Sequence, residues 1–481
     1  CRRYWHVCHL GTFKQTKQII TIKMNQHNLI LLDFPWMRDK DPRVPLGHAS
    51  LLATLAQNPA ITCHSLVRPM NDDFLFSPEA IWDEIRALIA LHEGSHLDVA
   101  IGAYVWAEEI LQTLLPKIRT QLPHGRIIIG GPQISYCSSG LESIYPECDI
   151  FIRGYGEMAL SALLSESSKL EIQGVHYAGE PDQNLQTVVD LDMLPSPFLT
   201  GVVPLYEGSF LRWESQRGCP FSCSFCQHKE AGAKLRKKEF CSSRIFSEID
   251  NFCERKVGEI AILDPIFNAS SQSIPILQRF QKNNFLGKLS LQCRAEMITE
   301  EFIQSVNGLD VKLEFGLQTI HADEGSAVKR SNNMKKVSRV LEMVASAGIE
   351  FEVSIIFGLP NQTLESFIQT IGWCISKGVP TIKAFPLMLL RGTELEERKK
   401  EWNLLESMGT MPVVLSSDSY SVEDWKAMAK ISQALKLTEG AHPTSIEEVL
   451  NLSVNLDIDM PRFRPDALFN AEGGNLASES A

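Results

Sequence analysis

The segment Arg217–Gln227, RGCPFSCSFCQ, decides how the rest of this sequence is interpreted. It contains three cysteines, Cys219, Cys223 and Cys226, a few residues after a short apolar run that is typical of a strand. Thiolate is the protein ligand that iron–sulfur clusters prefer, and three thiolates bind only three irons of a cubane. The fourth iron then stays open, and an open metal position is where a substrate or cofactor can coordinate. The segment therefore predicts a 4Fe-4S cluster with one iron free of protein ligands.

Two other interpretations of the same segment stay open. The three cysteines could be incidental residues of a loop, although their spacing is close and regular. Alternatively, His228 could join them as the fourth ligand of a Cys₃His zinc site. His228 follows Cys226 by only two residues, and no second CxxC pair occurs downstream.

The residues that follow the cysteines predict a series of alternating strands and helices. Six strands are expected, at Leu211–Glu214, Glu259–Leu263, Lys288–Gln292, Val311–Phe315, Glu350–Ile356 and Thr381–Pro386. Strands that alternate with helices at this spacing build parallel sheets. Six such units indicate a partial barrel that is open on one side, with its active site at the carboxyl ends of the strands.

The CxxxCxxC arrangement, with Phe225 before its last cysteine, resembles the signature of the radical S-adenosylmethionine (SAM) superfamily. The resemblance covers about residues 206–395. It implies that the methionyl group of SAM chelates the open iron, and that reduction of the cluster cleaves SAM to a 5′-deoxyadenosyl radical. In such enzymes the cofactors break the bonds, and the protein positions them in one dry pocket.

Further segments resemble the SAM-binding motifs of this family, in the expected order. They are AILDPIFN, LQCRAEMITEE, LEFGLQT, IIFGLPNQTLESF and FPLMLLRGTEL. The resemblance implies that Phe225, Asp264, Arg294, Glu314, Gln318, Gly358, Leu359 and Pro360 bind SAM. Asp264 would lie near the methionyl amine, although the usual Gly-Gly-Glu is absent there. Arg294 would bind the carboxylate of SAM, because a guanidinium suits bidentate binding of a carboxylate.

The first third of the chain predicts a separate, doubly wound parallel sheet. Its expected strands are Asn28–Asp33, Thr62–Arg68, Asp98–Gly102, Arg126–Ile129 and Asp149–Ile152, with helical segments between them. Glycines follow the fourth and fifth of these strands. In an open sheet of this kind, ligands bind outside the carboxyl ends of the strands, where glycines let them approach the backbone.

A doubly wound domain in front of such a barrel resembles the cobalamin-dependent branch of the superfamily. The resemblance rests on Pro45-Leu46-Gly47, on IIIGGPQIS and on CDIFIRGYGE, and it implies that Leu46, Gly47, His48, Gly130, Gly131, Pro132, Gly154 and Glu157 bind cobalamin. The Asp-x-His-x-x-Gly motif that supplies an axial histidine in cobalamin-dependent mutases is absent from the sequence. His48 is more typical of a residue at a helix start than of a cobalt ligand.

These patterns divide the chain into five parts. We expect a leader that is non-native or disordered at residues 1–23, a cobalamin-binding type of domain at 24–165, a linker at 166–205, a radical SAM core at 206–395 and a small, mostly helical extension at 396–481.

The leading functional hypothesis is radical SAM chemistry with cobalamin-dependent methyl transfer to an unactivated carbon. A radical cyclisation, rearrangement or oxidation without methyl transfer is the first alternative, and a non-catalytic iron–sulfur or zinc protein is the second. We expect a small-molecule or peptide substrate and an electron donor such as flavodoxin or ferredoxin.

Composition bears on partners and location. The net charge of −12 disfavours nucleic acid, because binding to its phosphates requires excess positive charge. No apolar run approaches the roughly 20 residues that a membrane span needs. The expected location is therefore the cytoplasm.

Overall fold

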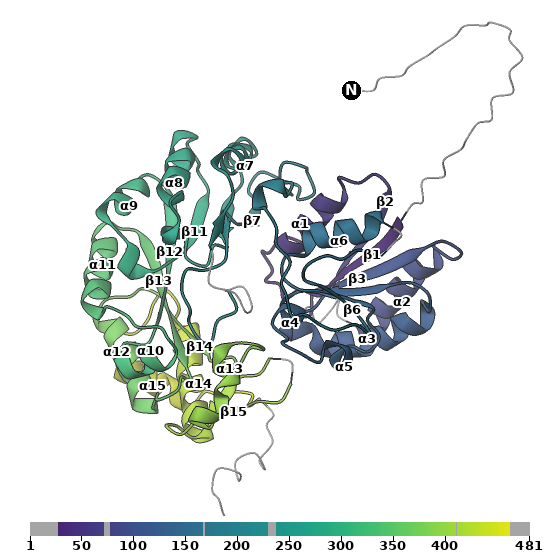
Figure 1. The fold of residues 1–481 in the computed structure, drawn as a ribbon. Helices are drawn as coiled ribbons and strands as arrows, with labels where there is room; N and C mark the ends of the chain where they lie inside the picture. The colour runs from purple at the N-terminus through teal and green to yellow at the C-terminus, as the bar shows by residue number, and fades with distance from the viewer. Residues whose placement is uncertain (1–26, 72–76, 167–168, 229–236, 410, 462–481) are drawn as a thin grey trace, which may run out of the picture.

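Two six-stranded sheets organise the chain (Figure 1). The computed structural model describes residues 27–71, 77–166, 169–228, 237–409 and 411–461. The expected leader at 1–23 lies outside these described residues. In Figure 1 the first sheet and its helices, drawn in purple and blue, lie beside the second sheet and its helices, drawn mostly in green. We call these two parts the front domain and the barrel domain.

The sheet of the front domain is parallel except for its last strand. Its order is β2-β1-β3-β4-β5-β6, and only β6 runs antiparallel to its neighbour. The strands are β1 (His27–Asp33), β2 (Ile61–Val67), β3 (Leu97–Gly102), β4 (Ile127–Gly130), β5 (Ile150–Ile152) and β6 (Val175–Tyr177). The five strands expected from the sequence are confirmed.

Helices cover both faces of this sheet, because successive strand residues point to opposite faces. Leu29 and Leu31 of β1 pack with α1 and α6, whereas Ile30 and Leu32 pack with α2 and α3. The helices are α1 (Leu46–Leu55), α2 (Pro78–Ala90), α3 (Glu108–Gln121), α4 (Pro132–Ser135), α5 (Leu141–Ile144) and α6 (Gly156–Ser165), with a 3-10 turn at Val105–Ala107. The sheet is therefore doubly wound, as its sequence pattern predicts.

The region expected to be a linker contributes to the front domain. Strand β6 extends the sheet, and a bridge joins Gly154 to Thr187 further along the chain. A strand of only three residues is too short to give a recognisable period, which is why the sequence pattern did not reveal it. A 3-10 turn at Leu191–Met193 precedes the barrel domain.

The barrel sheet is parallel throughout, in the order β14-β13-β12-β11-β10-β7. Its strands are β7 (Phe210–Trp213), β10 (Glu259–Ile262), β11 (Lys288–Cys293), β12 (Asp310–Gln318), β13 (Glu350–Phe357) and β14 (Ile382–Pro386). The six predicted strands are confirmed, and β12 continues three residues beyond its predicted end. Because β7 and β14 are the two edges, the sheet does not close on itself.

Helices cover the outer face of the barrel sheet. They are α7 (Ser242–Glu254), α8 (Ser273–Lys282), α9 (Glu300–Ser305), α10 (Ala322–Ala327), α11 (Met334–Ser346) and α12 (Leu364–Ser376), with 3-10 turns at Phe267–Ala269 and Ala295–Met297. Strand residues alternate accordingly: Leu313 and Phe315 are buried under the helices, and Lys312 and Glu314 point to the other side of β12. A two-stranded ribbon of β8 (Gln216–Arg217) and β9 (Lys238–Glu239) flanks the cysteine segment.

The C-terminal segment packs into the same hydrophobic core as the barrel. Trp425 and Met428 of α14, and Val449 of α15, are buried in that core. The elements are α13 (Glu394–Glu397), a 3-10 turn (Lys399–Trp402), β15 (Leu405–Glu406), β16 (Val414–Ser416), α14 (Val422–Leu437) and α15 (Ile446–Val454). Among the described residues, no helix combines the length and the apolar character that crossing a membrane requires.

Candidate active site between the two sheets

The cysteine segment forms a loop at the carboxyl end of β7. Cys219, Cys223 and Cys226 are half-buried and form no disulfide. Two backbone hydrogen bonds hold the middle of the loop: Ser224 N–H donates to Val328 O (3.0 Å), and Leu395 N–H donates to Ser224 O (2.9 Å). The loop is thereby fixed between the segment after α10 and the start of α13.

Two arginines lie next to these cysteines. The Arg294 guanidinium lies 4.2 Å from the centre of the Phe221 ring, and Arg330 donates to Gly316 O. Burial raises the pKa of the Cys219 thiol, as does its neighbour Cys223, and the charges of Arg330 and Arg294 act in the opposite direction. These guanidinium groups favour the thiolate form that a metal cluster requires.

Asp264 supports the segment that leads into the cysteine loop. Its carboxylate is buried and accepts hydrogen bonds from Ser215 N–H (2.8 Å), Gln216 N–H (3.1 Å) and the Ser215 hydroxyl. Burial raises its pKa to about 7, against the effect of these donors. Its contacts explain how it orders the loop, and its expected role at the methionyl amine stays a prediction.

The turn Gly358-Leu359-Pro360 is closely packed against the C-terminal segment. Gly358 has a φ of +90°, and a Cβ there would come within 3.2 Å of both Tyr420 Oη and Val414 O. Its carbonyl accepts from the Tyr420 hydroxyl (2.9 Å), and its N–H donates to Gln362 Oε1 (2.7 Å). These contacts account for the glycine, and the expected contact of this turn with adenine stays a prediction.

The remaining predicted SAM residues lie in or near the barrel interior. Glu314 and Gln318 are half-buried on the inner side of β12, and Gln318 adopts a φ of +70°. Burial and the neighbouring Glu352 raise the pKa of Glu314. Glu352 itself lies 2.6 Å from Lys312 Nζ and 2.8 Å from Lys383 Nζ. Phe225 packs against the barrel core from the cysteine loop.

A cavity of about 330 Å³ lies at the carboxyl ends of the front strands and reaches the barrel domain. Seven residues predicted to bind cobalamin line it: Leu46, Gly47, His48, Gly130, Gly131, Gly154 and Glu157. Pro132 lines a neighbouring cavity of about 380 Å³. The structure thus brings together the residues that the resemblance to the cobalamin-dependent branch singled out.

The two cavities join the front sheet to the cysteine loop. Both are lined by Gly131, Gly154 and Arg217, and the larger one extends to Gly218, Gln227 and His228. The Tyr136 hydroxyl of the front domain donates to Gln227 O at the end of the cysteine segment. A ligand seated on the front sheet would therefore face the cysteine loop directly.

Arg217 crosses the boundary between the domains, two residues before the first cysteine of the loop. Its guanidinium lies 2.8 Å from Glu157 of the front domain and 2.8 Å from Glu214 of the barrel domain. The Tyr155 ring lies beneath it, 5.1 Å away. Arg217 was not among the predicted site residues, because nothing in the sequence shows that residues 60 positions apart would meet.

His48 lines the cavity, and its ring nitrogens have protein neighbours. Nε2 lies 2.8 Å from Ser65 Oγ, and Nδ1 lies 3.5 Å from Asp33 Oδ2. Burial lowers the pKa of His48 to about 4 and raises the pKa of Asp33 to about 7. Asp33 Oδ1 is buried and has no hydrogen-bond partner in the protein. Asp33 and the half-buried Tyr104 line the cavity too and were not among the predicted residues.

Comparison with family models identifies the barrel domain. Residues 213–374 match the model described as the radical SAM superfamily. This match begins at the end of β7 and includes the cysteine loop and the strands up to β13.

Two curated relatives extend the likeness. The chain is 24% identical over 311 residues to the cobalamin-dependent radical SAM methyltransferase TokK of Streptomyces tokunonensis, covering 58% of this chain and 45% of the relative. It is 23% identical over 309 residues to the 2-(S-pantetheinyl)-carbapenam-3-carboxylate methyltransferase of Streptantibioticus cattleyicolor, with the same coverage. The chain thus matches less than half of the length of these relatives.

Solved structures share the fold across both domains. OxsB, a cobalamin-dependent SAM radical enzyme, aligns with a TM-score of 0.65 and 15% identity, over 89% of this chain and 70% of that chain. TsrM, a radical SAM methyltransferase from Kitasatospora setae, aligns with a TM-score of 0.60 and 15% identity, over 83% of this chain and 81% of that chain. These solved structures thus share the overall fold of this chain across both domains, and residues 213–374 match the radical SAM superfamily model.

Proposed function

We propose that this chain is a cobalamin-dependent radical SAM enzyme that transfers a methyl group to an unactivated carbon. The observation that carries the proposal is the pair of adjoining cavities that link the carboxyl ends of the front strands to the cysteine loop. When bound, the 4Fe-4S cluster supplies the electron that cleaves SAM, and cobalamin supplies the methyl group.

The front cavity has features that fit a cobalamin. Gly131 has a φ of +102°, and a Cβ there would come within 2.7 Å of Ala103 O, so glycine lets the loops after β3 and β4 pack closely beside this cavity. The unpartnered Asp33 Oδ1 lies in the wall of this cavity. A buried oxygen without a partner costs about 1–3 kcal/mol, which a hydrogen bond from a ligand would recover.

The cysteine loop has features that fit the cluster and SAM. Three half-buried thiols share one loop, and Arg294 and Arg330 provide positive charge beside them. The proposed role of Arg294 is to bind the SAM carboxylate. Phe225, Asp264, Glu314, Gln318 and the Gly358-Leu359-Pro360 turn are proposed to line the rest of the SAM site.

The protein's own side chains would hold the reactants in place. Arg217 contacts both Glu157 and Glu214, and it would thereby hold the wall of the front cavity next to the cysteine loop. The apolar lining of the front cavity, including Leu31, Leu51 and Leu160, would exclude water from the reacting groups.

Each part of the chain has its own role in this proposal. Residues 24–165 would bind cobalamin, with the β6 segment completing their sheet, 206–395 would bind the cluster and SAM, and 396–481 would shape the barrel mouth. The substrate would be a small molecule or a peptide. An electron donor such as flavodoxin or ferredoxin would reduce the cluster, as expected for an enzyme of the cytoplasm.

The test uses the full chain with its cluster assembled under anaerobic conditions. We expect bound hydroxocobalamin in the absorption spectrum, a change in the electron paramagnetic resonance of the reduced cluster on adding SAM, and formation of 5′-deoxyadenosine. Cys223→Ala should abolish the cluster signal. Cys241→Ala removes a cysteine outside the loop and should preserve it.

The possible outcomes separate the alternatives. Protein that forms 5′-deoxyadenosine but does not bind hydroxocobalamin would contradict methyl transfer and favour radical cyclisation, rearrangement or oxidation. A cluster signal that SAM leaves unchanged would contradict radical chemistry altogether. Iron-free protein with zinc on the cysteines would support the structural zinc alternative.

A further inference from the structure

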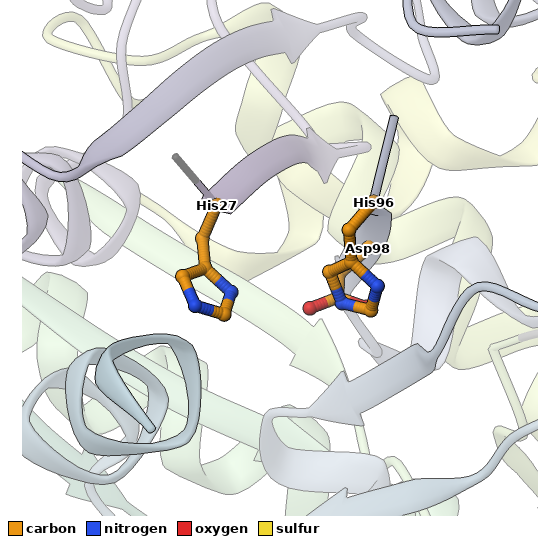
Figure 2. Close-up of side chains that lie close together, drawn as sticks. All are labelled: His27, His96 and Asp98. Carbon is orange, nitrogen blue, oxygen red and sulfur yellow. The ribbon is translucent and has the colours of Figure 1, made fainter. Parts of the chain in front are cut away.

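A second group of metal-binding side chains lies at the opposite end of the front sheet. His27 is the first residue of β1, His96 precedes β3, and Asp98 is the second residue of β3 (Figure 2). Strands β1 and β3 pair in register, with Asn28 beside Leu97. This parallel pairing brings the three side chains together at the amino ends of the strands, whereas the two adjoining cavities described above lie at the carboxyl ends.

The three side chains offer ligand atoms at close range. One atom from each lies within 4.8 Å of the other two. In Figure 2 the Asp98 side chain lies partly behind the His96 ring, and the His27 ring lies opposite them with a nitrogen turned toward the group. Two imidazoles and one carboxylate form a donor set that zinc binds in proteins.

The carboxylate of Asp98 is held rigidly. It is fully buried in a salt bridge with Arg126, whose Nε donates to both oxygens (3.1 Å each) and whose Nη2 donates to Oδ2 (2.5 Å), while the backbone N–H of Arg126 donates to Oδ1 (3.1 Å). His96 Nε2 lies 3.2 Å from Asp98 Oδ1. Carboxylates that bind metals are usually oriented by such outer hydrogen bonds.

His27 supplies a second observation that points to a ligand. His27 is only 9% exposed, and its Nδ1 is buried without a hydrogen-bond partner. A buried nitrogen left unpaired costs about 1–3 kcal/mol. A metal ion between His27, His96 and Asp98 would satisfy this nitrogen.

We propose that His27, His96 and Asp98 bind a zinc ion, separate from the cluster site. Three protein ligands leave one position of a tetrahedral ion for water, on the side where His96 is exposed. The ion would tie the start of β1 to the start of β3 and so stabilise the front domain. Arg126 forms a direct salt bridge with Asp98 and competes with a cation for its carboxylate, so we expect a lower affinity than for a zinc site without a bound guanidinium.

The test measures zinc on the full chain after its iron–sulfur cluster has been assembled, so that the loop cysteines are occupied. After equilibration with zinc chloride and desalting, we expect about one zinc ion per chain. His96→Ala should lose this ion and should fold normally, because the His96 side chain is 49% exposed. His27→Gln should lose it as well.

The matched control is the other histidine pair of the front domain. The Nε2 atoms of His64 and His92 lie 2.8 Å apart. Among the described residues, no third side chain completes a metal-binding group with this pair. His64→Ala should keep the zinc. Zinc should also raise the melting temperature of the wild type and of His64→Ala, but not that of His96→Ala.

X-ray absorption at the zinc edge identifies the ligands. We expect nitrogen and oxygen neighbours at about 2.0–2.1 Å, without a sulfur shell at about 2.3 Å. Equal zinc content in wild type and His96→Ala would overturn the proposal. A sulfur shell would assign the zinc to cysteines, and this too would overturn it. None of these measurements depends on SAM cleavage or cobalamin, so a negative result leaves the proposed function unaffected.

Discussion

Arg217 couples the two domains at the cavity, because it contacts a carboxylate of each. Glu157, which it contacts, also accepts a hydrogen bond from the Ser50 hydroxyl (2.9 Å). The side chains of Arg217 and Glu157 are 12% and 6% exposed, so water compensates little for a lost partner. Removing one member of a buried ion pair leaves an uncompensated charge.

Replacement of this arginine should therefore be costly. We expect Arg217→Met to lower the free energy of unfolding by about 3–5 kcal/mol, because Glu157 and Glu214 lose their shared cation. Urea denaturation measures the change. Arg339→Met removes an arginine that is 80% exposed, and it should change stability by less than about 0.5 kcal/mol. Adding Glu157→Gln to Arg217→Met should recover part of the loss. Equal stability of Arg217→Met and Arg339→Met would contradict this interpretation.

Asp33 should make stability depend on pH. Its pKa of about 7 lies above its usual value of 3.8, because it is buried. The folded state therefore binds the proton more tightly than the unfolded state, and stability falls as pH rises from about 4 to about 7. We expect Asp33→Asn to be more stable than wild type at about pH 8 and nearly equal to it at about pH 4.

Urea midpoints at the two pH values measure this effect. Asp83→Asn is the control, because the Asp83 side chain is 65% exposed and is therefore not desolvated as Asp33 is. A gain from Asp33→Asn that is the same at both pH values would show that ionisation of Asp33 is not its cause.

Among the secondary-structure elements, the loops after β3 and β4 shape the front cavity. Gly131 follows β4 with φ +102° and ψ −177°, a region that essentially only glycine occupies. Its neighbour across the loop is Ala103, whose carbonyl accepts from Gln133 N–H (3.2 Å). These two loops pack closely at the wall of the cavity, which Gly131 lines.

A methyl group at this position should disturb the loops. We expect Gly131→Ala to reduce stability by about 1–3 kcal/mol and to weaken hydroxocobalamin binding, because the Cβ would come within 2.7 Å of Ala103 O. Spectroscopic titration with hydroxocobalamin measures the affinity. Gly140→Ala is the control: its φ is +78°, but a Cβ there has no atom within 4 Å. An unchanged affinity in Gly131→Ala would contradict the assignment of this cavity to cobalamin.

The whole molecule depends on contacts between its two domains at separate points. Near the start of the barrel strands, Arg212 donates to Asp41 from Nε (3.1 Å) and Nη2 (2.6 Å), and Lys40 lies 2.6 Å from Glu259. On another side, Arg391 donates to Gln133 O (3.0 Å). These contacts hold the front cavity against the cysteine loop.

Loss of these contacts should loosen the arrangement without unfolding either domain. We expect Asp41→Ala combined with Arg391→Ala to increase the radius of gyration measured by small-angle X-ray scattering, with unchanged circular dichroism. Hydrogen bonds to charged groups contribute about 1.5–3 kcal/mol each, and the double variant removes those that Asp41 and Arg391 make across the boundary. Lys256→Ala, which removes a 70% exposed lysine, should leave the scattering unchanged. Unchanged scattering in the double variant would contradict a role for these contacts.

Local patterns carried much of the information about this fold. The apolar runs of β1 and β3 and the alternation in β12 are visible in the sequence because they reflect burial on one or both faces of a strand. The short β6 and the packing of α14 and α15 into the barrel core were not visible, since neither depends on a local period. The predicted SAM residues Asp264 and Gly358 proved to have structural contacts that motif comparison does not reveal.

The amino-acid sequence by itself determined the two-sheet architecture, the three cysteines of the loop and the glycines at the strand ends, because thiolate spacing and strand periodicity are local properties. Only the tertiary structure decided that Arg217 joins Glu157 to Glu214, that Asp33 faces a cavity, and that His27 meets His96 and Asp98. Those contacts join residues that are far apart in the chain, and they exist only once the strands have paired in their register.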